Sequence, residues 1–179
     1  MEKRLTFQYG RALVAGRLAI VAGAAVFLGI VVGTFQNLQW EILALLVGAL
    51  ATYLVVFTIS PLLTDHWLTR SRLILRQGWY FRAIIAIAEI ESLEVSDEAD
   101  SRRVPLGIHR PLGRPTLYVT GARTGLLTLR LSQPRRFWQS LGLFASEIIF
   151  DVRDPEGMRR ALNDRRRLLS PVQAHGPDT

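Results

Sequence analysis

Histidine and cysteine are the side chains that most often bind metal ions or act in catalysis, and this 179-residue chain has few of them. It has no cysteine, which excludes disulfides, cysteine-ligated zinc or iron–sulfur sites and a cysteine nucleophile. Its three histidines, His66, His109 and His175, lie far apart, and the sequence has no H-E-x-x-H motif. Glycine-rich nucleotide loops and a G-x-S-x-G nucleophile motif are also absent from the sequence. We therefore expect no catalytic residue, no cofactor and no metal site, and we do not expect an enzyme.

Three carboxylates, Glu89, Glu91 and Glu94, are close enough in sequence to suggest an acid–base pair. In a strand, however, residues 89 and 91 share one face only because side chains alternate between the two faces. Solvated surface charge is therefore the expected state of these groups.

Arginine is the most frequent charged residue, and the chain has 22 Lys and Arg against 15 Asp and Glu, a formal net charge of +7. One proline-rich stretch contains four arginines: Arg102, Arg103, Arg110 and Arg114. A basic residue held near an anionic membrane leaflet gains about 1 kcal/mol, so these four form our candidate lipid-headgroup site. The alternative, a solvated loop, stays open. Nucleic acid is not an expected partner, because no stacking aromatic residues are interleaved with these arginines.

The elements that must position these groups begin with a nearly uncharged N-terminal third. Residues 18–35 and 42–63 contain no charged side chain. An 18-residue helix is roughly 27 Å long, close to the hydrocarbon thickness of a bilayer. We expect two membrane spans, at about residues 14–35 and 40–62, joined as a hairpin within an N-terminal region of residues 1–63. A cleaved signal peptide is disfavoured, because the first run is too long for one and a second span follows at once.

Basic residues flank this hairpin and are absent from its short loop. Those before and after the spans are Lys3, Arg4, Arg11 and Arg17, and then Arg70, Arg72 and Arg76. The positive-inside rule predicts a multi-pass protein of the cell membrane with two spans and with both termini in the cytoplasm. No ionisable residue lies at the centre of either run, so an ion path through these two spans alone is not expected.

Small residues recur four apart within both runs. Gly29 and Gly33 form a G-x-x-x-G pair in the first, and Ala44 and Gly48 have the same spacing in the second. Such residues let helix backbones approach closely in a bilayer. We expect them to pack the two spans against each other, and the alternative is a homodimer interface that makes the protein a homo-oligomer.

The remainder, residues 64–170, shows the alternating apolar pattern of short strands, followed by a flexible tail at 171–179. Gly121 and Gly125 bound a turn expected to join two neighbouring strands as a hairpin. Asp154 and Pro155 begin a helix that is expected to end near Leu169, with Met158, Leu162 and Leu169 facing inward. The expected strands are residues 66–76, 79–87, 91–97, 116–120, 126–131 and 147–152.

Residues 40–170 resemble the bacterial pleckstrin-homology-like (PH-like) membrane proteins. The resemblance rests on Trp67–Gly78 (WLTRSRLILRQG), on Ile90–Val95 (IESLEV) and on the closing helix after Asp154. It implies a membrane α-helical hairpin plus a mostly β, α+β cytoplasmic domain. That domain would be a roll of two orthogonal sheets or a small barrel, closed by a C-terminal helix and used to bind peptides, proteins or headgroups. The resemblance implies no catalytic residue.

These observations lead to one expected function. We expect a non-catalytic integral membrane protein that presents a PH-like binding or scaffolding domain at the cytoplasmic membrane surface. Its partners would be the lipid bilayer and either a recruited protein or anionic lipid headgroups. The alternative is an accessory subunit of a membrane enzyme or transporter.

Overall fold

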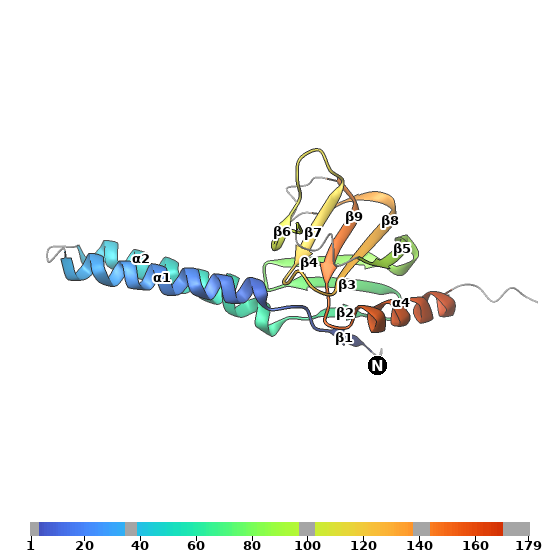
Figure 1. The fold of residues 1–179 in the computed structure, drawn as a ribbon, viewed down its shortest axis with the longest axis horizontal. Coiled ribbons are helices and arrows are strands. Elements are labelled where there is room, and N and C mark those ends of the chain that lie inside the picture. The colour runs from blue at the N-terminus through green and yellow to red at the C-terminus, as the bar shows by residue number, and fades with distance from the viewer. Residues whose placement is uncertain (1–3, 35–38, 97–102, 138–143, 170–179) are drawn as a thin grey trace, which may run out of the picture.

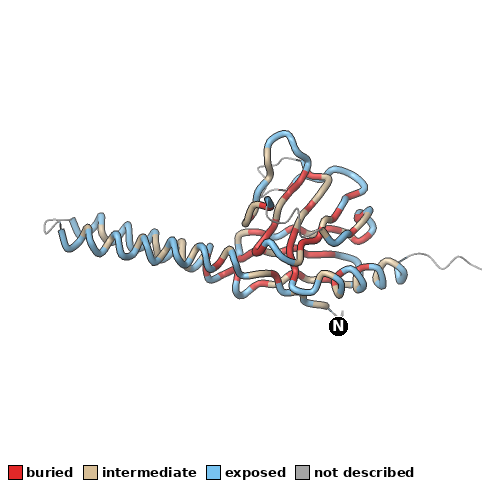
Figure 2. The backbone as a smooth tube through the Cα atoms, viewed as in Figure 1, coloured by how far each residue is buried: buried red, intermediate tan, exposed pale blue. Residues whose placement is uncertain are grey.

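The computed structural model describes residues 4–34, 39–96, 103–137 and 144–169. Two long helices lie side by side and project from a β-rich domain of two sheets, and a C-terminal helix packs against that domain (Figure 1). Buried residues concentrate between the sheets, whereas the helices are exposed along most of their length (Figure 2). The predicted tail at 171–179 lies outside the described residues.

The two projecting helices are long and apolar enough to cross a membrane. The first is α1 (Ala12–Thr34), and the second is a continuous helical run, Trp40–Leu63, with only 6% of its most apolar window buried. That run is α-helical in α2 (Trp40–Tyr53), π-helical over Leu54–Ile59 and 3-10 helical over Ser60–Leu63. The two membrane-length helices expected from the uncharged runs are confirmed.

Pro61 lies where the second helical run has changed from π-helical to 3-10 geometry. Pro61 has no N–H, so it cannot donate to the carbonyl of Phe57 four residues earlier. A guanidinium N–H of Arg17 in α1 donates to that carbonyl instead. A side chain of the first helix thus bonds the backbone of the second beside its proline.

The first sheet is antiparallel, in the order β1-β2-β3-β4. The expected strand 66–76 is in fact two strands, because Thr69 and Arg72 form a tight turn in which the Thr69 hydroxyl accepts the Arg72 N–H. Strand β1 precedes α1 and lies in a region where no strand was predicted; it pairs with β2, with Leu5 opposite Leu68. The bounds are β1 Leu5–Phe7, β2 His66–Leu68, β3 Arg72–Gln77 and β4 Phe81–Ala86.

The second sheet has the order β5-β8-β9-β7-β6. Strands β7 and β8 are not neighbours, because β9 lies between them and runs parallel to β7. The expected hairpin at Gly121–Gly125 is therefore wrong: this segment turns toward the start of α1, where Leu13 N–H donates to Gly121 O. The bounds are β5 Ile90–Val95, β6 Gly107–His109, β7 Thr116–Thr120, β8 Leu126–Arg136 and β9 Phe144–Asp151.

A short 3-10 turn, Ile87–Glu89, leads from the first sheet into the second, and the sheets are not closed into a barrel. The small barrel of the PH-like expectation is therefore not what the described strands form. Their apolar faces enclose one core, whose fully buried members include Phe81, Ile85, Leu127 and Phe150.

Helix α4 (Pro155–Leu169) closes this core and confirms the predicted C-terminal helix. Asp154 caps its start, since its carboxylate accepts the Gly157 N–H at 2.8 Å. Met158 and Leu162 are fully buried as expected, but Leu169 is 41% exposed, so its predicted inward position is wrong. Ala161 contributes to the packed face of the helix instead.

Candidate functional site

Buried polar groups gather where the two long helices enter the β-rich domain. The Tyr9 side chain, only 6% exposed, donates its hydroxyl proton to Pro61 O at 2.5 Å and lies 2.9 Å from Thr64 Oγ1. Thr64 Oγ1 in turn accepts the Gly78 N–H at 2.9 Å. One hydrogen-bonded chain thus joins the segment before α1, the end of the second helical run and the β3–β4 turn. Burial raises the pKa of the Tyr9 hydroxyl to about 12.

The β3–β4 turn is held directly against the second helical run. Trp79 N–H donates to Ser60 Oγ at 3.1 Å. Gly78 has a φ of +66°, and a Cβ on it would lie 2.5 Å from the same Ser60 oxygen. Glycine is required at this position both for the left-handed backbone and for the close approach.

Asp151, at the end of β9, is a carboxylate with no exposed surface. It accepts the Gly10 N–H at 2.6 Å and the Gly121 N–H at 2.5 Å, so one side chain ties the N-terminal segment to the loop after β7. Burial raises its pKa to about 6, although the backbone N–H donors favour the ionised form. Both glycines are needed, because a Cβ on Gly10 would lie 2.1 Å from the Ala122 side chain and one on Gly121 2.3 Å from Gly10 O.

His66 lies beside this carboxylate network and is 1% exposed. Its Nδ1 accepts the Arg76 N–H at 3.1 Å, and its ring stacks on Tyr9 at 5.1 Å and meets the edge of Phe150 at 5.5 Å. Burial lowers the pKa of the imidazole to about 3, so the ring is neutral at physiological pH. His66 Nε2 has no hydrogen-bond partner among the described residues.

The sequence analysis missed this junction. The predicted strand 147–152 contains Asp151 without giving it a role, and Tyr9 precedes the first predicted span. The available signal was the glycine pair Gly10 and Gly121, which marks a close approach of two segments but does not identify the partner. Only the fold brings these residues together.

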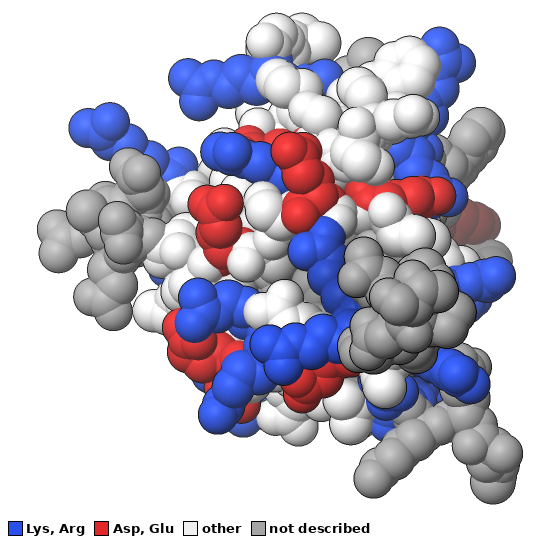
Figure 3. Space-filling model, turned by 90° about the vertical axis from the view of Figure 1, so that its right-hand side faces the viewer, with Lys and Arg blue, Asp and Glu red and all other residues white. Residues whose placement is uncertain are grey.

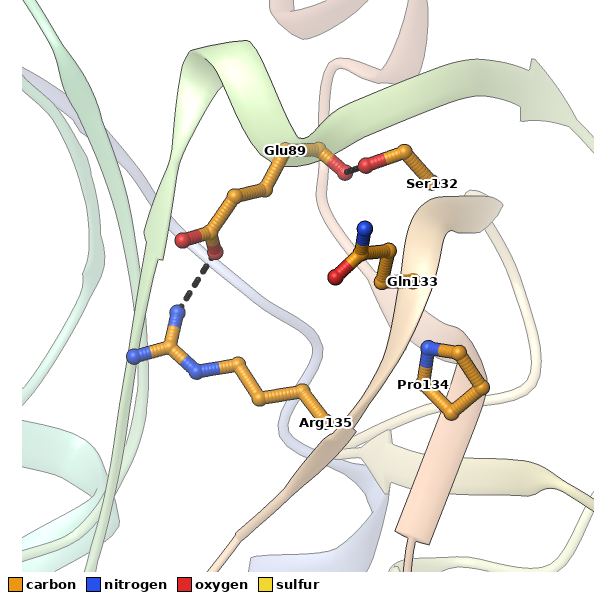
Figure 4. A pocket seen from close by; sticks show the side chains of 5 residues that line it. All are labelled: Glu89, Ser132, Gln133, Pro134 and Arg135. Carbon is orange, nitrogen blue, oxygen red and sulfur yellow. Dashed lines mark hydrogen bonds and ion pairs between the residues drawn. The ribbon is translucent and has the colours of Figure 1, made fainter.

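A surface pocket of about 490 Å³ lies between the 3-10 turn and the far part of β8 (Figure 4). Its lining residues bind one another: Ser132 Oγ donates to Glu89 O at 3.2 Å, and Arg135 pairs with the Glu89 carboxylate at 2.6 Å. The Glu89 side chain is 48% exposed, in agreement with the expected solvated charge. Gln133 and Pro134 complete the lining.

The candidate headgroup arginines differ in their surroundings. Arg103 and Arg114 are exposed, whereas Arg110 donates from Nε and Nη2 to Phe144 O at 3.0 and 2.7 Å. Arg110 therefore anchors the β6–β7 loop to the start of β9. Arg102 lies outside the described residues. A headgroup role for these four arginines stays a prediction.

The small residues of the two long helices face open space. A Cβ added to Gly29, Gly33 or Gly48 would meet no heavy atom of a neighbouring element within 4 Å. Within a single chain these glycines therefore do not create a close contact between the helices. Packing of the two spans through these residues and Ala44 stays a prediction, as does the alternative of a homodimer interface.

Potential metal ligands do not converge in the part of the chain that the structure describes, where no group of three His, Cys, Asp or Glu side chains could hold an ion. His66 is buried at the junction, while His109 is exposed and its Nε2 lies 2.9 Å from Leu106 O. His175 lies outside the described residues.

No protein-family model, no curated protein and no solved structure matches this chain. The chain consists of two helices apolar enough to cross a membrane and a β-rich domain of two sheets with a C-terminal helix. The buried polar junction between these parts is its most constrained site.

Proposed function

We propose that this chain is a non-catalytic integral membrane protein that holds a PH-like scaffolding domain at the cytoplasmic membrane surface and recruits a protein partner. The hairpin would cross the bilayer twice, and the face of the domain opposite the hairpin would receive the partner. The observation that carries this proposal is the junction, which fixes the domain on the hairpin.

The connections at the junction are too short and too well bonded to act as flexible linkers. Only two residues, Thr64 and Asp65, separate the second helical run from β2. Hydrogen bonds of Thr64 with Tyr9 and Gly78 tie this connection to the segment before α1 and to the β3–β4 turn. Asp151 adds a second tie through Gly10. A domain held in this way presents a constant face to the cytoplasm, which suits a scaffold better than a mobile tether would.

Two features support the PH-like part of the proposal. The domain has two mainly antiparallel sheets around one core, and α4 places Met158 and Leu162 into that core. Two other features depart from a simple roll: β7 and β9 run parallel, and β1 comes from the segment before the hairpin. Binding of a peptide, protein or headgroup without covalent chemistry is the activity that such an arrangement suggests.

The membrane arrangement can be tested by cysteine labelling, because the chain has no native cysteine. Gln39→Cys places a thiol beside the hairpin tip, and Leu112→Cys places one on a side chain that is 88% exposed in the domain. In intact cells a membrane-impermeant maleimide should label position 39 but not position 112, which should react only after permeabilisation. The reverse pattern would overturn the proposed orientation.

Recruitment of a partner can be tested with a photo-cross-linking amino acid at Gln133, which is exposed beside the Figure 4 pocket. The matched control position is Ile20, 63% exposed on α1. A discrete protein adduct in living cells from position 133 alone is the expected result. No adduct at position 133 would argue against a partner there, and an adduct from position 20 would favour the accessory-subunit alternative.

A further inference from the structure

The β3–β4 turn lies beside the second helical run before that run ends. Trp79 N–H bonds Ser60, three residues before Leu63 ends the run, and the Tyr80 ring lies 5.0 Å from the Phe57 ring. At the rise of a helix, three residues correspond to about 5 Å. If the part of the run that precedes the buried residues Thr58 and Ser60 fills the hydrocarbon layer, the turn lies at the depth of the headgroups.

The Trp79 side chain at this depth is 58% exposed, although its backbone is fixed. Tryptophan is enriched at membrane–water interfaces, where its ring lies among headgroups and its N–H can still form hydrogen bonds. Arg17 of α1 lies at the same depth, because its guanidinium donates to Tyr80 Oη at 2.8 Å and lies 5.6 Å from the Tyr80 ring centre. An aromatic anchor on the turn and a cation from α1 thus lie together, as they do in interfacial segments of membrane proteins.

A second part of the domain lies at its hairpin end. Strand β6 is the edge of the second sheet on the hairpin side, and β5 is the opposite edge (Figure 1). Residues 103–125, which contain β6 and β7, include four arginines and no Asp or Glu. At the tip of the β6–β7 loop, Leu112 is 88% exposed, and the exposed Arg114 follows it closely.

The side of the domain away from the hairpin has a different charge pattern. Viewed from that end, acidic side chains are interspersed among basic ones (Figure 3). Glu91 and Glu94 lie on β5, and Glu156 pairs with Arg159 on α4. Within residues 104–125, Arg110, Arg114 and Arg123 thus have no acidic neighbour in sequence, whereas Asp97, Glu98 and Asp100 precede Arg103. Basic residues without acidic neighbours are what an anionic leaflet would attract.

We propose that the hairpin side of the domain rests on the bilayer, with Trp79 anchored among the headgroups and with Arg103, Leu112 and Arg114 forming a second contact that requires anionic lipid. This inference rests on the proposed function, since it assumes that the hairpin spans the membrane. It names the anionic lipid surface as the partner of the hairpin side of the domain. It also assigns an interfacial role to two residues, Trp79 and Leu112, outside the arginine cluster.

The test uses the full-length chain reconstituted into vesicles of phosphatidylcholine alone or mixed with phosphatidylglycerol. Single-cysteine variants Trp79→Cys, Leu112→Cys and Gln133→Cys carry an environment-sensitive fluorophore, and lipids with a quencher near the headgroups report contact. Position 133 is the matched control, because it is also exposed but lies on far β8. Resistance of the protein to carbonate extraction reports separately whether the hairpin is inserted.

We expect several-fold stronger quenching at position 79 than at position 133 in both kinds of vesicle. At position 112 we expect quenching only with phosphatidylglycerol. It should be lost at about 0.5 M salt, where the Debye length falls to roughly 4 Å, and on adding Arg103→Gln with Arg114→Gln. Quenching at 79 should persist under both changes, because the fold sets its depth.

Two outcomes would overturn the inference while leaving the proposed function intact. Equal quenching at positions 79 and 133 in carbonate-resistant protein would reject the anchor. Quenching at 112 that is absent with anionic lipid, or unchanged by salt and by the arginine substitutions, would reject the second contact. Release of the protein by carbonate would instead reject the membrane hairpin, and with it both proposals.

Discussion

Replacing His66 with Gln and, separately, Asp151 with Asn should change the pH dependence of stability in opposite directions. Both groups are buried at the junction, and burial opposes the charged form of each. The imidazole pKa is lowered from 6.5 to about 3, and the carboxyl pKa is raised from 3.8 to about 6. Between about pH 4 and pH 6, the two groups therefore change the free energy of unfolding in opposite directions as the pH falls.

The sign follows from proton binding in the folded and unfolded states. In this range the unfolded chain protonates His66 and the folded chain does not, so this group lowers the free energy of unfolding as pH falls. The folded chain protonates Asp151 and the unfolded chain does not, so this group raises the free energy of unfolding as pH falls. Each slope is about 1.4 kcal/mol per pH unit, and in the wild-type chain they cancel.

Each substitution exposes the slope of the remaining group. Relative to wild type, Asp151→Asn should lose about 3 kcal/mol between pH 6 and pH 4, and His66→Gln should gain a similar amount. Asp151→Asn also has a pH-independent cost of about 1–3 kcal/mol, because an amide oxygen replaces only one of the two acceptors for Gly10 and Gly121.

The assay is urea unfolding of the full-length chain in a mild detergent, followed by tryptophan fluorescence at several pH values. The rest of the chain is the same in all three proteins, so the differences from wild type isolate the two buried groups. Differences that stay constant from pH 4 to pH 6 would refute the assignment of perturbed pKa values at the junction.

Three further substitutions test the junction and the core by the same unfolding assay. Tyr9→Phe should cost about 1–3 kcal/mol, because the buried acceptor Pro61 O loses its donor, and an unchanged stability would contradict the hydrogen-bonded chain. Gly78→Ala should cost about 1–3 kcal/mol through its positive φ and its clash with Ser60 of the second helical run; a neutral result would show that the turn can move away from the helix. Met158→Ala should cost about 2–5 kcal/mol by leaving a cavity, whereas Leu169→Ala should cost less than about 0.5 kcal/mol, and similar costs for both would contradict the packing of α4.

Local patterns in the sequence predicted the elements whose environment is uniform along their length. Two uncharged runs predicted helices of membrane length, because no charged side chain interrupts them. Asp154 followed by proline predicted the start of α4, since capping depends on a few adjacent residues. Met158 and Leu162 followed from the helical period.

The remaining features depend on contacts between distant residues. Asp151 resembles a surface residue in an alternating strand, and it is buried only because Gly10 and Gly121 approach it from other segments. The glycine-bounded segment after β7 looks like a hairpin turn until β9 inserts between the two strands. Propensity cannot reveal this order, because the parallel pairing is a property of the whole sheet.

The pairing of β1 with β2 has a consequence for biogenesis. Leu5 and Leu68 are partners across a ladder, so the pair of long helices is an excursion of the chain between two adjacent strands. Both helices must be synthesised before this sheet can gain its outermost strand. A soluble fragment starting at Asp65 would lack Tyr9 and Gly10 and would leave the edge of β2 unpaired, which favours self-association. Synthesis of the helices and completion of the domain are therefore successive steps of one assembly process.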